Sequence, residues 1–166
     1  LKESLAGNDE EKTAKQYEKL SKELAEKGEY AKAETYMKRA LEIYARLNKK
    51  KEVAKVSRGL AKVQESQNKI APAIKNYQNA AEKTKDKILE QANLNDAKRL
   101  RGNTSLEEKK NYSETNANLF EQEGKKEEAA DAYQQLAETQ LQQNKSDAAI
   151  SSYKKAIAIS TKPEEE

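Results

Sequence analysis

A spacing of small and large residues that recurs four times is the feature of this chain that most restricts its fold. Each copy has an alanine, a large side chain four positions later and, in three copies, a second alanine after three more. Residues four and seven apart lie on one face of an α-helix, so each copy forms a narrow strip beside a bulky ridge. Such a strip lets a second helix approach closely. The copies are Ala33, Met37 and Ala40; Ala73, Tyr77 and Ala80; Ala129, Tyr133 and Leu136; and Ala149, Tyr153 and Ala156.

Helical periodicity extends over nearly the whole chain, and no window shows the alternation of a β-strand. The sequence therefore predicts an all-α fold with about seven helices. The segment 88–105 has no place in the repeating pattern, and either extends the fourth helix or forms a short extra helix. We favour an extension to about Leu100, because Ile88, Leu89 and Ala92 continue a helical stripe. The expected helices are 9–27, 30–47, 51–67, 70–90, 106–123, 126–143 and 146–160.

The composition favours a thin, repetitive structure over a thick globule. Charged residues make up 37% of the chain and hydrophobic residues 35%, a low apolar fraction for one large core. It suits a fold in which each element contacts only its neighbours. The regular spacing of the apolar residues, with two prolines and five glycines, argues against disorder. We expect a single repeat domain over residues 1–166, a fragment of a longer protein, since it begins at Leu1 and ends in KPEEE.

The residue types that most enzymes need are missing from the chain. It has no His and no Cys, which excludes thiolate chemistry and leaves only carboxylates for a metal site. The glycines are isolated, so no phosphate-binding loop is expected. Glu127 and Glu128 are better explained as acids at a helix start than as an acid–base pair. The sequence predicts no enzyme, no cofactor and no metal site.

Most of the tyrosines stand at helical spacing beside small residues, where core packing is a better explanation than ligand binding. Two tyrosines near helix ends, Tyr44 and Tyr112, are left unassigned. The tyrosines assigned to packing are Tyr17, Tyr30, Tyr36, Tyr77, Tyr133 and Tyr153.

The small and large positions resemble the tetratricopeptide repeat, a helix pair that stacks into a right-handed α-solenoid. Later units match at fewer positions, and Ser57 and Gln64 stand where larger apolar residues are usual. Two of the alanines, Ala33 and Ala73, lie 40 residues apart, which is similar to the long repeats of bacterial signalling proteins such as Bacteroidetes-type sensor histidine kinases. The helix 126–143 is expected to belong to two pairs. The first unit matches at Tyr17, Leu20, Ser21, Leu24, Gly28, Tyr30, Ala33, Met37 and Ala40.

In this family, side chains of each pair's first helix line a groove that binds a protein or peptide. The resemblance therefore implies a groove with a basic end, where five cations of two first helices form one stripe, and an amide-rich or acidic end. The stripe favours an acidic partner, although the family's pattern for clamping a carboxylate terminus is not present. The alternative is that these residues form an ordinary solvent-exposed helix face and bind no partner. The expected groove residues are Lys15, Glu18, Lys22, Lys55, Arg58, Lys62, Asn111, Glu114 and Asn118.

The leading functional hypothesis is a non-enzymatic protein- or peptide-interaction module, the sensor or scaffold region of a bacterial signal-transduction protein. The alternative is a structural repeat protein of an envelope assembly or secretion complex. An RNA-binding repeat is the third hypothesis, but no aromatic and arginine interleaving supports nucleic acid. No segment approaches the length of a membrane span. A periplasmic location is slightly favoured over a cytoplasmic one, and a homodimer is left open.

Overall fold

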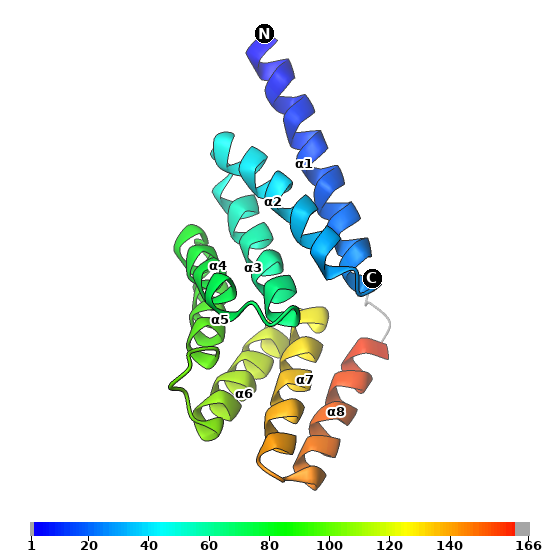
Figure 1. The fold of residues 1–166 in the computed structure, drawn as a ribbon, viewed down its shortest axis with the longest axis vertical. Helices are drawn as coiled ribbons and strands as arrows, with labels where there is room; N and C mark the ends of the chain where they lie inside the picture. Colours follow the sequence, from blue (N-terminus) through cyan, green and yellow to red (C-terminus); the bar gives the residue numbers. More distant parts are fainter. Residues whose placement is uncertain (1, 162–166) are drawn as a thin grey trace. The chain divides into compact units, whose positions relative to one another are not determined.

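A computed structural model describes residues 2–161 of the chain, with the side chains of residues 2–5 left out. Over this range the structure is helical and has no β-strand, which confirms the predicted all-α fold. The helices follow one another as consecutive packed pairs (Figure 1). They are α1 (Lys2–Glu26), α2 (Tyr30–Arg46), α3 (Lys50–Ser66), α4 (Ile70–Lys83), α5 (Lys87–Arg99), α6 (Leu106–Gln122), α7 (Lys126–Gln142) and α8 (Ser146–Thr161).

The chain divides into two compact units, the first ending at Ala97 and the second starting at Lys98. In the first unit α1 packs on α2, α2 on α3 and α3 on α4. In the second unit α7 packs on both α6 and α8, as expected for a helix that belongs to two pairs. Each unit is therefore a stack of antiparallel helices, the arrangement of a tetratricopeptide-like α-solenoid.

Five of the connections between packed helices are the same tight turn. In each turn, the second residue after the end of the helix has a positive φ, between 56° and 78°. Glycine favours this conformation and asparagine tolerates it. After α2, for example, Lys49 N–H donates to the Tyr44 carbonyl over 2.9 Å and closes the helix end. This geometry reverses the chain at once, so consecutive helices pack as hairpins. The five residues are Gly28, Asn48, Asn68, Gly124 and Asn144.

The segment 88–105 differs from the favoured prediction, because α4 does not continue to residue 100. It ends at Lys83, and Thr84 has extended backbone with ψ of 143°. A new helix follows, and the Asp86 carboxylate accepts a hydrogen bond from the Ile88 N–H over 2.9 Å. A side-chain acceptor at that place satisfies a backbone donor that a helix start leaves unpaired. The described residues thus form eight helices, not seven, and the short extra helix was the right alternative.

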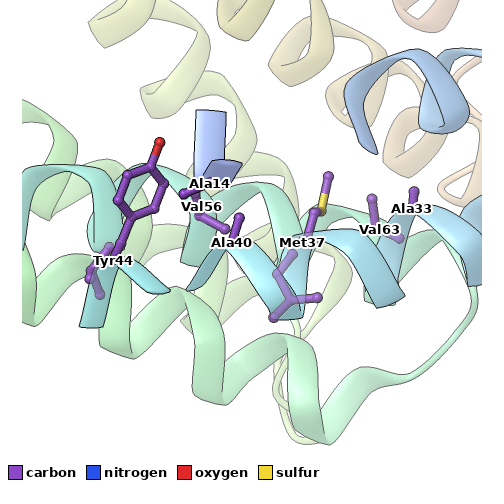
Figure 2. Packing of buried hydrophobic residues seen from close by; sticks show 9 residues of the cluster. Ala14, Ala33, Met37, Ala40, Tyr44, Val56 and Val63 are labelled. Atoms are coloured by element: carbon purple, nitrogen blue, oxygen red, sulfur yellow. The ribbon is translucent and has the colours of Figure 1, made fainter. Parts of the chain in front are cut away.

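The core of the first unit lies where α1, α2 and α3 meet (Figure 2). Ala33 and Ala40 are fully buried, and Met37 lies between them on the same face of α2, as the sequence pattern predicted. Tyr44, which the sequence left unassigned, is also fully buried. Tyr30, in contrast, was expected to pack but is 36% exposed, because it is the first residue of α2 and lies at the edge of the hairpin.

The second unit repeats this packing with other side chains. Tyr133 and Leu136 of α7 are buried against Ala117 of α6, and Ala156 of α8 packs on the same cluster. The large side chain of Phe120 on α6 is fully buried. The two units thus have the same kind of thin core, one helix layer deep, that the composition indicated.

Replacing Ala33 with leucine tests the register of this packing. The Ala33→Leu variant should lose about 1–3 kcal/mol of unfolding free energy, because its Cβ faces a filled interior and extra methyl groups force neighbours apart. Chemical denaturation followed by helical circular dichroism measures the loss. The control is Ala31→Leu, an exposed position on the same helix. Equal stability of the two variants would contradict the assigned register.

Candidate functional site

The groove residues predicted on α1 lie on its surface, and they interact with other side chains of the chain. Lys15 and Lys22 are exposed, and the Lys15 ammonium lies 3.7 Å from the Glu11 carboxylate. Glu18 is half-buried and accepts a hydrogen bond of 2.5 Å from the Tyr44 hydroxyl. Both lysines are therefore exposed on this helix, while Glu18 links it to α2 through Tyr44.

The groove residues predicted on α3 have three different surroundings. Lys55 is exposed and Lys62 is half-buried. The Arg58 guanidinium donates to the Asp96 carboxylate and to the Asn93 side-chain oxygen, each over 2.8 Å. Arg58 is thus paired within the first unit, contrary to the open basic stripe that the sequence predicted. The reason is α5, a helix that the favoured prediction did not contain.

The remaining predicted groove residues lie on α6 in the second unit. Asn111, Glu114 and Asn118 are all exposed, at spacings of three and four that place them on one face of the helix. The candidate surface therefore consists of two sets, six residues in the first unit and three in the second. The structure brings α1 and α3 together through α2, on which both of them pack. An ion pair of 3.7 Å between Glu11 of α1 and Lys49, just before α3, joins them further.

A hydrogen bond between residues 12 apart fastens the hairpins of both units. The Tyr77 hydroxyl donates to Glu65 over 3.0 Å, and the Tyr133 hydroxyl donates to Glu121 over 2.6 Å. Burial first, and the bond to Glu121 second, raise the pKa of the Tyr133 hydroxyl to about 12. These tyrosines have structural partners, which agrees with their assignment to packing. The recurring spacing of 12 residues between Glu and Tyr is a sequence signal for these two hydrogen bonds.

Two comparisons with known sequences bear on this arrangement. Sequence models of the tetratricopeptide repeat match residues 22–86 and residues 130–163, which together take in more than half of the chain. The chain contains tetratricopeptide repeats. No curated protein matches the sequence. The repeats suggest a module for protein–protein interaction, and the family is typically non-catalytic.

The two matched ranges divide the helices unequally. The first range includes all of α2, α3 and α4, and the second covers α8 with most of α7. Both α5 and α6 lie outside the matched ranges. The regular repeats therefore flank a segment that departs from the family pattern, and this segment supplies the partners of Arg58.

A buried carboxylate, Glu34, joins the first repeat pair to the next, and the sequence analysis did not single it out. It receives hydrogen bonds from Gln67 over 2.7 Å and from Lys69 over 2.9 Å, and lies 3.1 Å from Lys38. Burial alone would raise the pKa of Glu34, but these donors, with Gln64, outweigh it and lower the pKa to about 2. Glu34 is therefore a charged link between α2 and the turn after α3.

The second unit carries a shallow apolar hollow of about 400 Å³ between α7 and α8, which the sequence analysis also missed. Ala130 and Gln134 of α7 and Tyr153 and Ile157 of α8 line it. Ile157 is 62% exposed, and Ile150 on the same helix is 51% exposed. A spacing of seven places both isoleucines on one face of α8.

Two further features of the described residues limit the chemistry. No helix within residues 2–161 combines the length and apolarity needed to cross a membrane. Across the same part of the chain, no three or more acidic side chains gather in a way that could hold a metal ion.

Proposed function

We propose that this chain is a non-enzymatic protein- or peptide-binding module. The observation that carries the proposal is the match of tetratricopeptide repeats to helix hairpins in which most of the repeated small and large positions are buried, although Leu20 and Tyr30 are exposed. The first helices then present charged and amide side chains to solvent. These are the side chains that a repeat of this family uses to hold a partner.

The basic set on α1 and α3 favours an acidic partner. Its exposed members are Lys15, Lys22 and Lys55, with Lys62 half-buried beside them. Residues 1–83 carry 19 basic and 13 acidic side chains, a net charge of +6, whereas residues 84–166 carry 13 and 16, a net charge of −3. Such an asymmetry orients a charged partner toward the first part of the chain. The same asymmetry would favour a homodimer in which opposite halves meet.

The biological setting that we propose is the sensor or scaffold region of a bacterial signal-transduction protein, with a periplasmic location. Its support is the distance of 40 residues between Ala33 and Ala73, together with the absence of His and Cys from the whole sequence. In this setting residues 1–166 act as one repeat domain. The second candidate is a structural repeat protein of an envelope assembly or secretion complex. The sequence of the full gene separates the two settings. A gene that also encodes a membrane span and a kinase core supports the signal-transduction protein, and one that adds only a lipoprotein signal supports the structural protein.

Reversing two exposed lysines tests the acidic-partner surface. The double variant Lys22→Glu and Lys55→Glu should bind a fluorescein-labelled poly-glutamate peptide at least about tenfold more weakly than the parent, a difference of about 1.4 kcal/mol. The melting temperature should barely change, since exposed charges contribute under about 1 kcal/mol. Fluorescence anisotropy at fixed salt measures the affinity.

The matched control reverses two exposed lysines that do not belong to the basic set, Lys75 on α4 and Lys154 on α8. This control should bind the peptide within about twofold of the parent. Equal weakening in both double variants would show a response to net charge alone, and the surface would then not be the site. Binding of a single-stranded RNA that falls steeply with salt would favour the nucleic-acid hypothesis instead.

A further inference from the structure

The helix α5 is fixed to the first unit by polar side chains. Its buried residues in that unit are two alanines, Ala92 and Ala97, and three polar residues, Asn93, Asn95 and Asp96. Each of the three helices before it buries a large apolar or aromatic side chain: Tyr44 on α2, Leu60 on α3 and Tyr77 on α4. The apolar burial of α5 comes from these two alanines and from the half-buried Ile88, Leu89 and Leu94, so this helix has no fully buried large apolar side chain.

The centre of this contact is Arg58. Its guanidinium reaches two groups of α5 at 2.8 Å each, the Asn93 oxygen and the Asp96 carboxylate, which lie three residues apart on one face of that helix. On the side of α4, the guanidinium carbon lies 5.5 Å from the centre of the Tyr77 ring. Asp96 is 1% exposed and Arg58 is 12% exposed. The Arg58 site, formed by Arg58 and Tyr77, thus recognises an amide and a carboxylate on one helix.

A contact of this kind holds a helix in place without making it hard to remove. A buried ion pair regains in attraction roughly what it loses in hydration, so its net stabilisation is small. Apolar burial, the main source of stability, is sparse on α5. Elements with few buried apolar contacts open locally at lower free energy than the rest of a fold. The break at Thr84 lets α5 move without unwinding α4.

We propose that the Arg58 site is a helix-docking site and that α5 is its resident, releasable occupant. The incoming partner is a helix that presents an amide and a carboxylate three residues apart, the pattern of Asn93 and Asp96. Because Arg58 lies on the helix face that lines the groove in this family, release of α5 adds a cation to the basic set of Lys22 and Lys55. This last consequence rests on the proposed function, whereas the release of α5 does not.

Hydrogen–deuterium exchange of the full chain tests the release of α5. In Asp96→Asn, amides of residues 90–97 should exchange at least about tenfold faster than in the parent, while those of α3 change less than about twofold. The matched control is Glu90→Gln, a change of the same charge on the same helix, whose carboxylate pairs with Lys87. In this control, the amides of α5 should exchange within about twofold of their rate in the parent. The double variant Arg58→Gln with Asp96→Asn leaves no charge buried without its partner, so its α5 amides should exchange at a rate closer to the parent than those of Asp96→Asn.

A peptide added in trans tests the site itself. The probe is a labelled synthetic peptide of residues 85–101, measured by fluorescence anisotropy. A chain with Asn93→Ala and Asp96→Ala should bind it at least about tenfold more tightly than the parent, and adding Arg58→Gln to that chain should abolish the gain. The same peptide with Asp96→Asn should bind poorly.

Several results would overturn the inference. One is that α5 and α3 exchange at the same rate in every variant, which means that α5 opens only with the whole unit. Another is equal acceleration by Glu90→Gln and Asp96→Asn. A third is equal binding of the peptide by the parent and the Asn93→Ala, Asp96→Ala chain, or binding that persists without Arg58. A failure of the lysine surface to bind poly-glutamate would change neither the hydrogen–deuterium exchange nor the binding of the 85–101 peptide, so the two proposals fail separately.

Discussion

Replacing Phe120 with alanine should lower the unfolding free energy of the second unit by about 3–5 kcal/mol. Phe120 is fully buried on α6, so the change removes a large apolar side chain and leaves a cavity that close-packed helices fill only in part. For a small unit with a thin core, this is a large share of its stability. Phe120→Leu, which keeps much of the volume, should cost under about 1.5 kcal/mol.

Because the chain has two units, the measurement must separate them. Hydrogen–deuterium exchange of α6, α7 and α8 should accelerate in Phe120→Ala while exchange of α2 and α3 stays close to the parent, since repeat folds are stabilised by neighbours. The surface control is Ile157→Ala, at a side chain that is 62% exposed, with an expected change of about 0.5 kcal/mol. Equal acceleration in both units would show that they unfold as one and would contradict the local effect.

Acid should weaken the first unit through Glu34. Its pKa in the folded state is about 2, below the ordinary value of 4.5, so folding favours the charged carboxylate. The charged Glu34 carboxylate therefore stabilises the folded state fully above pH 4.5, and this stabilisation is lost as the pH falls from 4.5 toward 2. The shift corresponds to a loss on the order of 3 kcal/mol, from 1.36 kcal/mol for each pKa unit.

Urea unfolding at several pH values between 7 and 2 measures this loss, with Glu34→Gln as the test variant. At pH 7 Glu34→Gln should be less stable than the parent, because Lys38 and Lys69 lose the negatively charged carboxylate with which they pair. The difference should shrink as the pH falls from 4.5 to about 2, because Glu34 becomes protonated over this range and reaches half-protonation in the folded state near pH 2. The control is Glu42→Gln, an exposed position on the same helix. A gap between parent and Glu34→Gln that stays constant with pH would contradict the role of the charge.

The helix pairs could be predicted from the sequence because one local pattern determines them. An alanine such as Ala73 or Ala129 is useful only where another helix comes close, and both are fully buried. The turns at Gly28 and Gly124 were visible as breaks, since a residue with positive φ is most often glycine. Both features depend on residues near one another in the sequence, so the spacing of the alanines and the positions of the glycines are enough to predict them.

The contacts around Arg58 and Glu34 could not be predicted in the same way. Their hydrogen bonds to α5 and to residues 64–69 join positions 30 or more apart, and the sequence does not show which polar side chains will meet. An arginine on a helix face looks solvated until the element that covers it is known. The missing element was α5, whose start depends on one side-chain acceptor, Asp86. The helical periodicity of the sequence continues on both sides of Thr84, so it did not reveal that the helix ends there.

The short-range character of the contacts in each unit has a consequence for how the chain folds. Hairpins are closed by bonds between residues 12 apart, and even the pair of Arg58 and Asp96 spans only 38 residues. Proteins dominated by such local contacts fold in microseconds to milliseconds, because little chain entropy is lost before contacts form. During synthesis the first hairpins can therefore assemble while later residues are still being added, and each new hairpin finds a folded neighbour on which to pack.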